Sequence, residues 1–463
     1  MLSLATHNFT SSIESAARRH DVYEDRAALI ARLLAVRAYS VALAEDWSAE
    51  DQAIQSMPDA SPTKWHLAHT SWFFEAVVLQ THQSGFTWFD ARFAHLFNSY
   101  YEALGTRHPR PARGVLSRPS LAQVQAYRVH VNAQLQAFAS DASPQAWAAA
   151  TPLLELGLHH EQQHQELMLT DLLHAFSCNP LLPACINTLA APGLRAVPQP
   201  AARWVSLPGG VHSVGHGGDG FAFDNEQPRH PVLLAPYQLA DRLVTCGEFA
   251  QFVADGGYRR AQFWLSDGWA AVQAHDWQAP AYWLAPGDAR APSQAWQTFG
   301  LHGVQPLDVD APVTQLSFYE ATAFAEWASA QAEWAGARLP TEFEWEAAFT
   351  SGHATQGLTQ MTGHAWQWTR SSYDPYPGFK PFAGAVGEYN GKFMSGQQVL
   401  RGSSLATPHG HARPSYRNFF PPAARWQFSG LRLAKDASRR LAKDASCRLA
   451  KDPSCRLSED IAC

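Results

Sequence analysis

Two histidines one helical turn apart are the first chemical feature of this 463-residue chain. His160 and His164 stand in Leu158–Leu167 (LHHEQQHQEL), within a stretch whose leucines recur at mostly helical steps. On a helix, residues four positions apart lie on the same face, so both imidazoles can converge on one ion. Two neutral imidazoles suit a borderline divalent metal such as iron or zinc. Because the chain has 21 histidines, this pair does not establish a metal site by itself.

A third ligand has to come from a different element. Lys64–Glu75 (KWHLAHTSWFFE) offers His66 and His69, which share a face of a second expected helix, so either can reach inward. We expect one of them, His66, to be a packing residue. Three histidines without a carboxylate leave up to three positions of an octahedral iron open for other ligands. An oxygen-activating centre requires such open positions.

The same block also matches the His-Glu-x-x-His pattern of zinc proteases, with Glu161 as the general base. That chemistry needs a third ligand shortly downstream. The chain has no acidic residue between Asp171 and Asp219, and no histidine between His174 and His212. His174 itself lies too far along the same helix to join the pair. The sequence therefore argues against a protease.

Composition narrows the class of partner. The net charge is -6, and the lysines and arginines are scattered, which is atypical of a nucleic-acid or anionic-membrane surface. The sequence contains no run of about 18 apolar residues and no N-terminal signal pattern. Six cysteines without CxxC spacing do not indicate a disulfide scaffold. We expect a cytoplasmic protein with small-molecule substrates, no nucleic-acid partner and no membrane partner.

The elements that position these residues are expected to form two domains. Apolar residues at helical steps and few glycines predict an antiparallel helical bundle that holds the metal ligands, with a helix starting at Ser61-Pro62-Thr63. Short apolar runs broken by Gly, Pro, Asp and Asn predict a loop-rich α+β domain after it. The expected order is an extension over 1–25, the bundle over 26–178, a linker over 179–203, the α+β domain over 204–436 and a degenerate eight-residue repeat tail over 437–463.

Further motifs, in order along the chain, resemble the ergothioneine-forming sulfoxide synthase family (EgtB). They are Ser56–His69, Phe97–Gly105 with Arg107–Pro111, His159–Leu167, Val244–Phe252, Ala337–Glu346, Gly363–Thr369, Leu400–Ser404, Tyr416–Phe420 and Gly430–Leu433. The resemblance spans roughly residues 26–435. It implies a DinB-like all-α bundle followed by an FGE-sulfatase domain, which has a C-type-lectin-like fold.

The resemblance also implies a reaction and a ligand set. It implies an iron(II)- and O2-dependent enzyme that joins a thiol to the imidazole C2 of hercynine (Nα-trimethylhistidine) as a sulfoxide, in ergothioneine biosynthesis. His69, His160 and His164 would be the Fe(2+) ligands. Gln163 would touch the substrate imidazole, because its amide can donate to or accept from a ring nitrogen without competing strongly for iron.

The remaining candidates follow from what the substrates need. A proton donor is required while O2 reacts, and Tyr100 and Tyr101 are our candidates, with Tyr373 and Tyr376 as rivals. Substrate-binding residues should include aromatic side chains for the quaternary ammonium and arginines for the carboxylates. These candidates are Asn418, Phe419 and Phe420, with Trp426 nearby, and Arg107, Arg110 and Arg113.

One departure from the family pattern concerns the thiol. Family members that use gamma-glutamylcysteine are expected to carry an acid and an arginine just after the asparagine that corresponds to Asn418. Here Phe419 to Ala424 (FFPPAA) follows, so cysteine is the favoured donor over gamma-glutamylcysteine.

Three other functions remain open at this stage. A formylglycine-generating enzyme would need a reactive cysteine pair, yet Cys246 stands alone in the folded part of the second domain. An ovothiol-type sulfoxide synthase typically adds a methyltransferase domain, for which no sequence remains. A non-catalytic lectin-like binding protein with a structural metal site is the third alternative.

Overall fold

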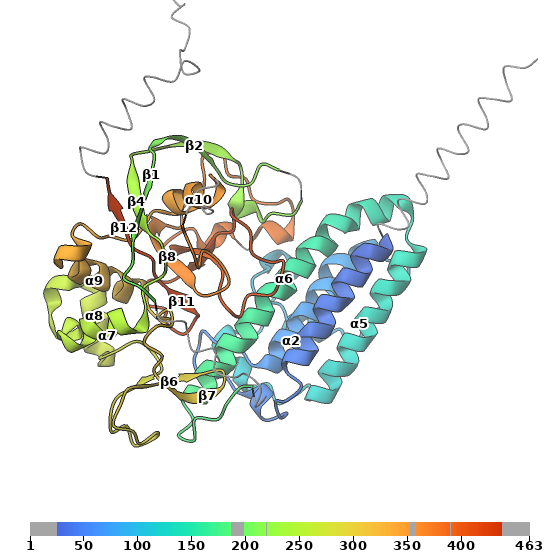
Figure 1. Ribbon diagram of the computed structural model, residues 1–463. Coiled ribbons are helices and arrows are strands. Elements are labelled where there is room, and N and C mark those ends of the chain that lie inside the picture. Colours follow the sequence, from blue (N-terminus) through green and yellow to red (C-terminus); the bar gives the residue numbers. More distant parts are fainter. Residues whose placement is uncertain (1–25, 187–198, 219, 352–356, 389, 438–463) are drawn as a thin grey trace, which may run out of the picture. The chain divides into compact units, whose positions relative to one another are not determined.

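The chain consists of two compact units, Met1–Ala175 and Phe176–Cys463. The computed structural model describes residues 26–186, 199–218, 220–351, 357–388 and 390–437 (Figure 1). The extension expected over 1–25, residues 187–198 of the expected linker and the repeat tail beyond residue 437 lie outside the described residues. Unit 1 is helical, and unit 2 carries every strand found in the described ranges. The predicted fold class, an all-α bundle followed by a loop-rich α+β domain, is confirmed.

Unit 1 is a bundle of long helices (Figure 1). Its long elements are a helix over 26–43, α2 (Thr63–Phe73) with its π-helical continuation η2 (Phe74–Leu79) and α3 (Gln80–His82), α5 (Leu121–Asp141) and α6 (Pro144–Ser177). Shorter helices connect them: η1 (Asp51–Ala53), α4 (Phe93–Leu96), η3 (Glu102–Leu104) and η4 (Arg110–Val115). No helix in the described ranges is both long and apolar enough to cross a membrane.

Helix α2 lies at the centre of unit 1, since all of its residues are buried. It begins at Thr63 as the sequence predicts, but its N-cap residue Pro62 makes no side-chain cap. The backbone N–H of Ser61 instead donates to Asp171 Oδ2 on α6 at 2.8 Å. The start of α2 is therefore anchored to the helix that carries the paired histidines.

A glycine lets these two helices approach closely. A Cβ atom added to Gly157 of α6 would lie 2.4 Å from Cε1 of Phe74 and 2.9 Å from Cε1 of Phe73. Real Cβ atoms do not come so near an aromatic carbon, so only glycine leaves room for both rings. This contact lies one turn before His160 and brings the histidine-bearing faces together.

The described residues of unit 2 form short strands in four small sheets. The sheet orders are β1-β4-β12, β10-β9-β8-β11, β2-β3 and β5-β6-β7, and all pairs are antiparallel except β11 with β8. The strands are β1 (Trp204–Leu207), β2 (Gly210–Val214), β3 (His230–Leu234), β4 (Tyr237–Ala240), β5 (Trp283–Leu284), β6 (Gln297–Gly300), β7 (Gly303–Pro306), β8 (Trp366–Ser372), β9 (Gln398–Gly402), β10 (Asn418–Phe420), β11 (Ser429–Gly430) and β12 (Ala434–Asp436).

The helices of unit 2 begin with strong sequence signals. Capping boxes start three of them, at Thr245, Ser317 and Thr341, each with a glutamate three residues later. The α-helices are α7 (Cys246–Ala254), α8 (Ser266–His275), α9 (Phe318–Ser329) and α10 (Glu342–Thr350). The 3-10 helices are η5 (Asp224–Glu226), η6 (Gly257–Arg259), η7 (Ala261–Phe263), η8 (Ala332–Trp334), η10 (Ala385–Glu388) and η11 (Gly391–Phe393).

Buried ion pairs hold the segment that leads into β10. Arg417 donates from Nε and Nη2 to the two carboxylate oxygens of Glu342 on α10, at 2.9 and 3.0 Å. Arg401 of β9 pairs with Glu346 one turn further along α10. Because these charges are buried, each requires its partner. The network therefore fixes the backbone immediately before Asn418.

Candidate metal centre

The structure brings His69, His160 and His164 into one cluster. One ligand nitrogen from each ring lies within 4.8 Å of the other two. The Nε2 atoms of His160 and His164 are 3.1 Å apart, and the two ring centroids are separated by 4.6 Å. The ring of His69 lies 5.0 Å from that of His160 and 4.8 Å from that of His164. The paired histidines of α6 thus meet a third imidazole from α2.

Aromatic side chains of α2 and a backbone carbonyl hold His69 in place. Its ring stacks on Trp65 at 4.6 Å and on Trp72 at 5.5 Å, and both indoles are buried. Its Nδ1 atom lies 2.6 Å from the carbonyl oxygen of Phe97. A hydrogen on Nδ1 can donate to this oxygen, which leaves the Nε2 lone pair for a metal.

The environment keeps all three imidazoles neutral. Burial lowers the pKa of His160 to about 4, although the nearby Glu161 carboxylate opposes this effect. Burial, and then the neighbouring His160, lower the pKa of both His69 and His164 well below the ordinary value. Neutral imidazole is the form that binds a metal.

This donor set fits a divalent transition metal. Two nitrogens at roughly 2.1 Å from one ion and at right angles to each other would lie about 3 Å apart, close to the spacing between His160 and His164. The cluster contains no carboxylate, and nitrogen donors suit iron, zinc or copper better than magnesium or calcium. The three histidines therefore form a suitable site for the iron implied by the resemblance.

Glu161 does not face the cluster as a protease base would. Its carboxylate accepts from Arg37 at 2.9 Å, Arg128 at 2.7 Å and Ser40 at 2.7 Å, all in the bundle interior. Burial alone would raise its pKa, but the two arginines lower it to about 2. A carboxylate held this way is a weak base, so the structure agrees with the argument against a protease.

His66 is not simply the packing residue we expected from the sequence. It is buried, but its Nδ1 lies 2.7 Å from Nδ1 of His164, and its Nε2 lies 3.1 Å from Asp171 Oδ2. Sequence reasoning missed Asp171, which lies 105 positions from His66. Its spacing of seven residues from His164, two helical turns, was the available signal.

The tyrosine pair lies on the same loop that orients His69. Tyr101 is buried, and its ring lies 5.7 Å from Trp72 and 6.3 Å from Phe73. Phe73 in turn contacts His160, with 4.8 Å between the ring centroids. Tyr101 is thus connected to the histidine cluster through the rings of Trp72 and Phe73.

The three candidate arginines lie in different surroundings. Arg110 donates from Nη1 to the hydroxyl oxygen of Tyr100 at 2.9 Å, and Arg107 is exposed and paired with Glu102. Arg113 is buried, with its guanidinium 3.3 Å above the ring of Trp65. The structure therefore brings Arg110 to the tyrosine pair and Arg113 to the aromatic stack on His69.

The rival tyrosines are engaged within unit 2. Asn225 donates to the hydroxyl of Tyr373 at 2.9 Å, and the hydroxyl of Tyr376 donates to Glu342 at 3.0 Å. Burial, and then Glu342, raise the pKa of Tyr376 well above its ordinary value. Both side chains thus have structural bonds in the core of this unit.

Strand β10 separates the candidate substrate residues of unit 2. Phe419 stacks on Tyr373 at 4.0 Å between ring centroids, whereas Phe420 contacts Trp426 at 6.2 Å. Because successive side chains of a strand point to opposite faces, Asn418 and Phe420 share one face and Phe419 lies on the other. In unit 1, Gln163 is half-buried next to His164 on α6.

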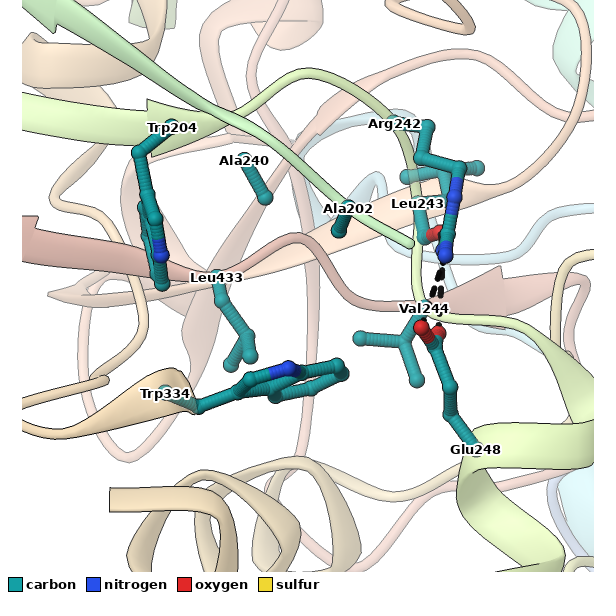
Figure 2. Close-up of a pocket in the computed structure, with 9 residues that line it drawn as sticks. All are labelled: Ala202, Trp204, Ala240, Arg242, Leu243, Val244, Glu248, Trp334 and Leu433. Carbon is teal, nitrogen blue, oxygen red and sulfur yellow. Dashed lines mark hydrogen bonds and ion pairs between the residues drawn. The ribbon is translucent and has the colours of Figure 1, made fainter. Parts of the chain in front are cut away.

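Two other features of unit 2 have structural explanations. Burial raises the pKa of the Cys246 thiol to about 12, which makes it unreactive. A small pocket lies between Trp204, Trp334 and Arg242 (Figure 2). All five N–H donors of Arg242 are engaged, by Glu248 and by two backbone carbonyls. This pocket therefore offers little for recognising a polar ligand.

Family comparisons agree with the two units. The profile of the DinB superfamily matches residues 32–168, and that of the sulfatase-modifying factor enzyme 1-like domain matches 191–356 and 354–437. The protein is thus a two-domain chain that joins a DinB-type bundle, which carries the three-histidine cluster, to a sulfatase-modifying-factor-like domain.

Curated relatives define the family more narrowly. The chain is 31% identical over 432 residues to the hercynine oxygenase of Mycobacterium tuberculosis, covering 84% of this chain and 95% of the relative. It is 31% identical over 461 residues to that of Mycolicibacterium thermoresistibile, covering 89% and 96%. The chain belongs to the hercynine oxygenase family and is an enzyme, which confirms the resemblance inferred from the motifs.

A shorter match concerns the formylglycine-generating enzymes. The one from Streptomyces coelicolor is 36% identical over 178 residues, which is 36% of this chain and 52% of the relative. This partial match reflects a shared domain, and the unreactive Cys246 gives no support to that activity here.

Proposed function

We propose that this chain is an iron(II)- and O2-dependent sulfoxide synthase that joins the sulfur of cysteine to the imidazole C2 of hercynine, in ergothioneine biosynthesis. The observation that carries the proposal is the buried cluster of His69, His160 and His164, on a chain whose near full-length relatives are named hercynine oxygenases. Iron held by three neutral imidazoles would supply O2 activation and a binding position for the thiol.

The protein's own contribution begins with the orientation of the ligands. Trp65 and Trp72 hold the ring of His69 between them, and the Phe97 carbonyl fixes which nitrogen is protonated. These contacts leave the Nε2 atoms facing one point. With no carboxylate in the cluster, several coordination positions remain for substrates.

We propose Tyr101 and Tyr100 as the proton donors. Tyr101 contacts the aromatic residues that touch His69 and His160, while the hydroxyl of Tyr100 accepts from Arg110. Tyr373 and Tyr376 are less suitable, because their hydroxyls are engaged in the core of unit 2.

The substrates require two further groups of residues. We propose that Arg110, with Arg107 or Arg113, binds the carboxylate of the thiol substrate, because a guanidinium can bind a carboxylate with two hydrogen bonds. We propose that Asn418 and Phe420, with Trp426, bind hercynine, whose quaternary ammonium favours an aromatic surface. Phe419 supports them from the opposite face through Tyr373. Gln163 is proposed to contact the substrate imidazole.

The choice of cysteine rests on charges that are missing or already paired. The residues from Phe419 to Ala424 carry no charge, so this segment offers no cation for the extra carboxylate of gamma-glutamylcysteine. The next cation, Arg425, pairs with Glu320 at 2.8 Å and lies over the ring of Trp277. Both interactions favour a structural role for the Arg425 side chain within unit 2.

The test is an anaerobic reconstitution with Fe(II), followed by O2, hercynine and either cysteine or gamma-glutamylcysteine, with mass detection of the sulfoxide. We expect an iron-dependent product, formed with a higher kcat/KM from cysteine. His69→Ala should abolish it, whereas His174→Phe, outside the cluster on α6, should retain it. If neither thiol gives an iron-dependent product, the enzyme assignment is wrong. If gamma-glutamylcysteine is preferred, only the choice of donor is wrong.

A further inference from the structure

One of the three clustered histidines is connected to a carboxylate through another histidine. His164 Nδ1 lies 2.7 Å from His66 Nδ1, and His66 Nε2 lies 3.1 Å from Asp171 Oδ2. Asp171 also accepts from the backbone N–H of Ser61 at 2.8 Å. The path leaves α6 at His164, crosses to α2 at His66 and returns to α6 two turns further on.

The positions of the hydrogens follow from these distances. If Nε2 of His164 binds a metal, its hydrogen has to be on Nδ1, where Nδ1 of His66 is close enough to accept it. His66 must then carry its own hydrogen on Nε2, which faces the Asp171 carboxylate. Each hydrogen bond thus has one donor and one acceptor, and the carboxylate ends the chain.

The other two histidines of the cluster, His69 and His160, have no such hydrogen-bonded path to a carboxylate among the described residues. His69 Nδ1 faces a neutral carbonyl, and Nδ1 of His160 is buried without a hydrogen-bond partner in the described structure. A carboxylate behind an imidazole fixes its tautomer and makes it a stronger electron donor to the metal. His164 therefore differs from the other two ligands in the partner that orients it.

We propose that His66 and Asp171 are positioning residues that hold His164 in its metal-binding tautomer and strengthen its bond to the metal. This inference rests on the proposed metal site. It assigns a role to two buried residues that are not among the proposed metal ligands or substrate-binding residues. The hydrogen-bonded path from His164 through His66 to Asp171, here called the relay, also links the two ligand-bearing helices, because His66 belongs to α2 and Asp171 to α6.

The experiment compares metal binding by the full chain and its variants, without turnover. Anaerobic Fe(II) titration measures affinity, and Co(II) serves as a spectroscopic probe of the ligand field. In His66→Phe, His164 loses its acceptor, so affinity should fall by about ten- to a hundredfold and the Co(II) absorption bands should shift. In Asp171→Asn the amide oxygen can still accept from His66, so a smaller loss in the same direction is expected.

The matched control is His130→Phe. His130 lies on α5 and packs against Phe89, with 5.3 Å between the ring centroids, so its replacement should leave affinity and the Co(II) spectrum unchanged. Unchanged affinity and spectrum in folded His66→Phe and Asp171→Asn would overturn the relay alone. If His66→Phe does not fold, unchanged binding by Asp171→Asn does the same. Absence of metal binding by the unmodified protein would overturn the metal site and the relay with it.

Discussion

At the scale of single residues, protonation controls the proposed site. The three imidazoles are buried, and burial is the largest cause of the lowered pKa of each. A protonated imidazole is positively charged, so protonation of any of the three would repel a metal ion. The same burial that prepares the ligands therefore makes the metal-free protein sensitive to acid.

This burial predicts how the stability of the metal-free protein depends on pH. Histidines of the unfolded chain have a pKa near 6.5, whereas burial lowers the pKa of His160 in the fold to about 4. Between these values the unfolded chain binds more protons, so the free energy of unfolding should fall as the pH is lowered from about 6.5 to about 4. Urea unfolding measured at several pH values in this range should show that the free energy of unfolding of His160→Leu changes less steeply with pH. An identical slope would contradict the burial argument.

The proton-donor proposal predicts a change in product. Tyr101→Phe or Tyr100→Phe should divert the reaction from the sulfoxide toward oxidised thiol, because the thiol and O2 still react when the phenolic proton is missing. Mass analysis of the ratio of sulfoxide to oxidised thiol measures the effect, with Tyr127→Phe as a control elsewhere in the bundle. If both variants keep the original ratio, the donor is another residue.

Sequence reasoning reached the site residues to different extents. The four-residue spacing of His160 and His164 predicts their shared face directly, because helical geometry is local. We expected His66 to pack and His69 to bind the metal, and the family resemblance implies the same ligand, but spacing alone could not separate them, since both lie on the same buried face of α2. The contact of His66 with His164 joins positions 98 residues apart, and no local pattern encodes it.

At the scale of elements, α6 must be held at one rotation about its axis. Glu161 does this by pairing with Arg37 of the helix over 26–43 and Arg128 of α5. Glu161, which resembles a protease base in the sequence, thus serves to fix the orientation of the helix that carries His160. This role could not be predicted from the sequence, because the two arginines lie 124 and 33 residues from it.

Removing this charge should destabilise the protein. Glu161→Gln leaves two buried guanidinium groups without a counter-charge, which typically costs about 3–5 kcal/mol. Urea unfolding measures the loss. The control is Glu155→Gln on the same helix, where a partly exposed carboxylate lies 3.9 Å from Arg32, and the expected change is under about 1 kcal/mol. Equal effects of the two substitutions would contradict the anchoring role.

Close packing of α6 against α2 predicts an unfavourable alanine. In an exposed helix, Gly→Ala is usually stabilising by about 1 kcal/mol. At Gly157 the new methyl group would meet Phe73 and Phe74, so we expect a net loss of about 1–3 kcal/mol and weaker Fe(II) binding. Gly300→Ala, where a Cβ meets nothing within 4 Å, should change neither quantity. Increased stability of Gly157→Ala would refute the close contact.

At the scale of the whole molecule, the proposed metal ligands and the proposed hercynine-binding residues belong to different units. The metal ligands belong to unit 1, and the proposed hercynine residues Asn418 and Phe420 belong to unit 2. Asn418→Ala should therefore raise the KM for hercynine severalfold and leave Fe(II) affinity unchanged. Steady-state kinetics and anaerobic titration measure the two quantities. Weaker iron binding by Asn418→Ala would contradict the assignment of Asn418 to hercynine binding and not to the metal site.

The fold class could be predicted because its signals are distributed along the chain. Helical spacing marks the bundle, and the capping boxes at Thr245, Ser317 and Thr341 mark helices of unit 2. The division of β10 into two faces was not predicted. Phe419 and Phe420 look equivalent in sequence, and only the position of Tyr373 shows which ring is used for packing.

The most direct test of the central claim is the source of the product oxygen. The reconstituted protein is supplied with Fe(II), cysteine, hercynine and 18O2, and the sulfoxide is analysed by mass spectrometry. We expect one labelled oxygen in the sulfoxide, and no product from His69→Ala, His160→Ala or His164→Ala. Unlabelled sulfoxide, or labelled product from any of these three variants, would contradict the central claim.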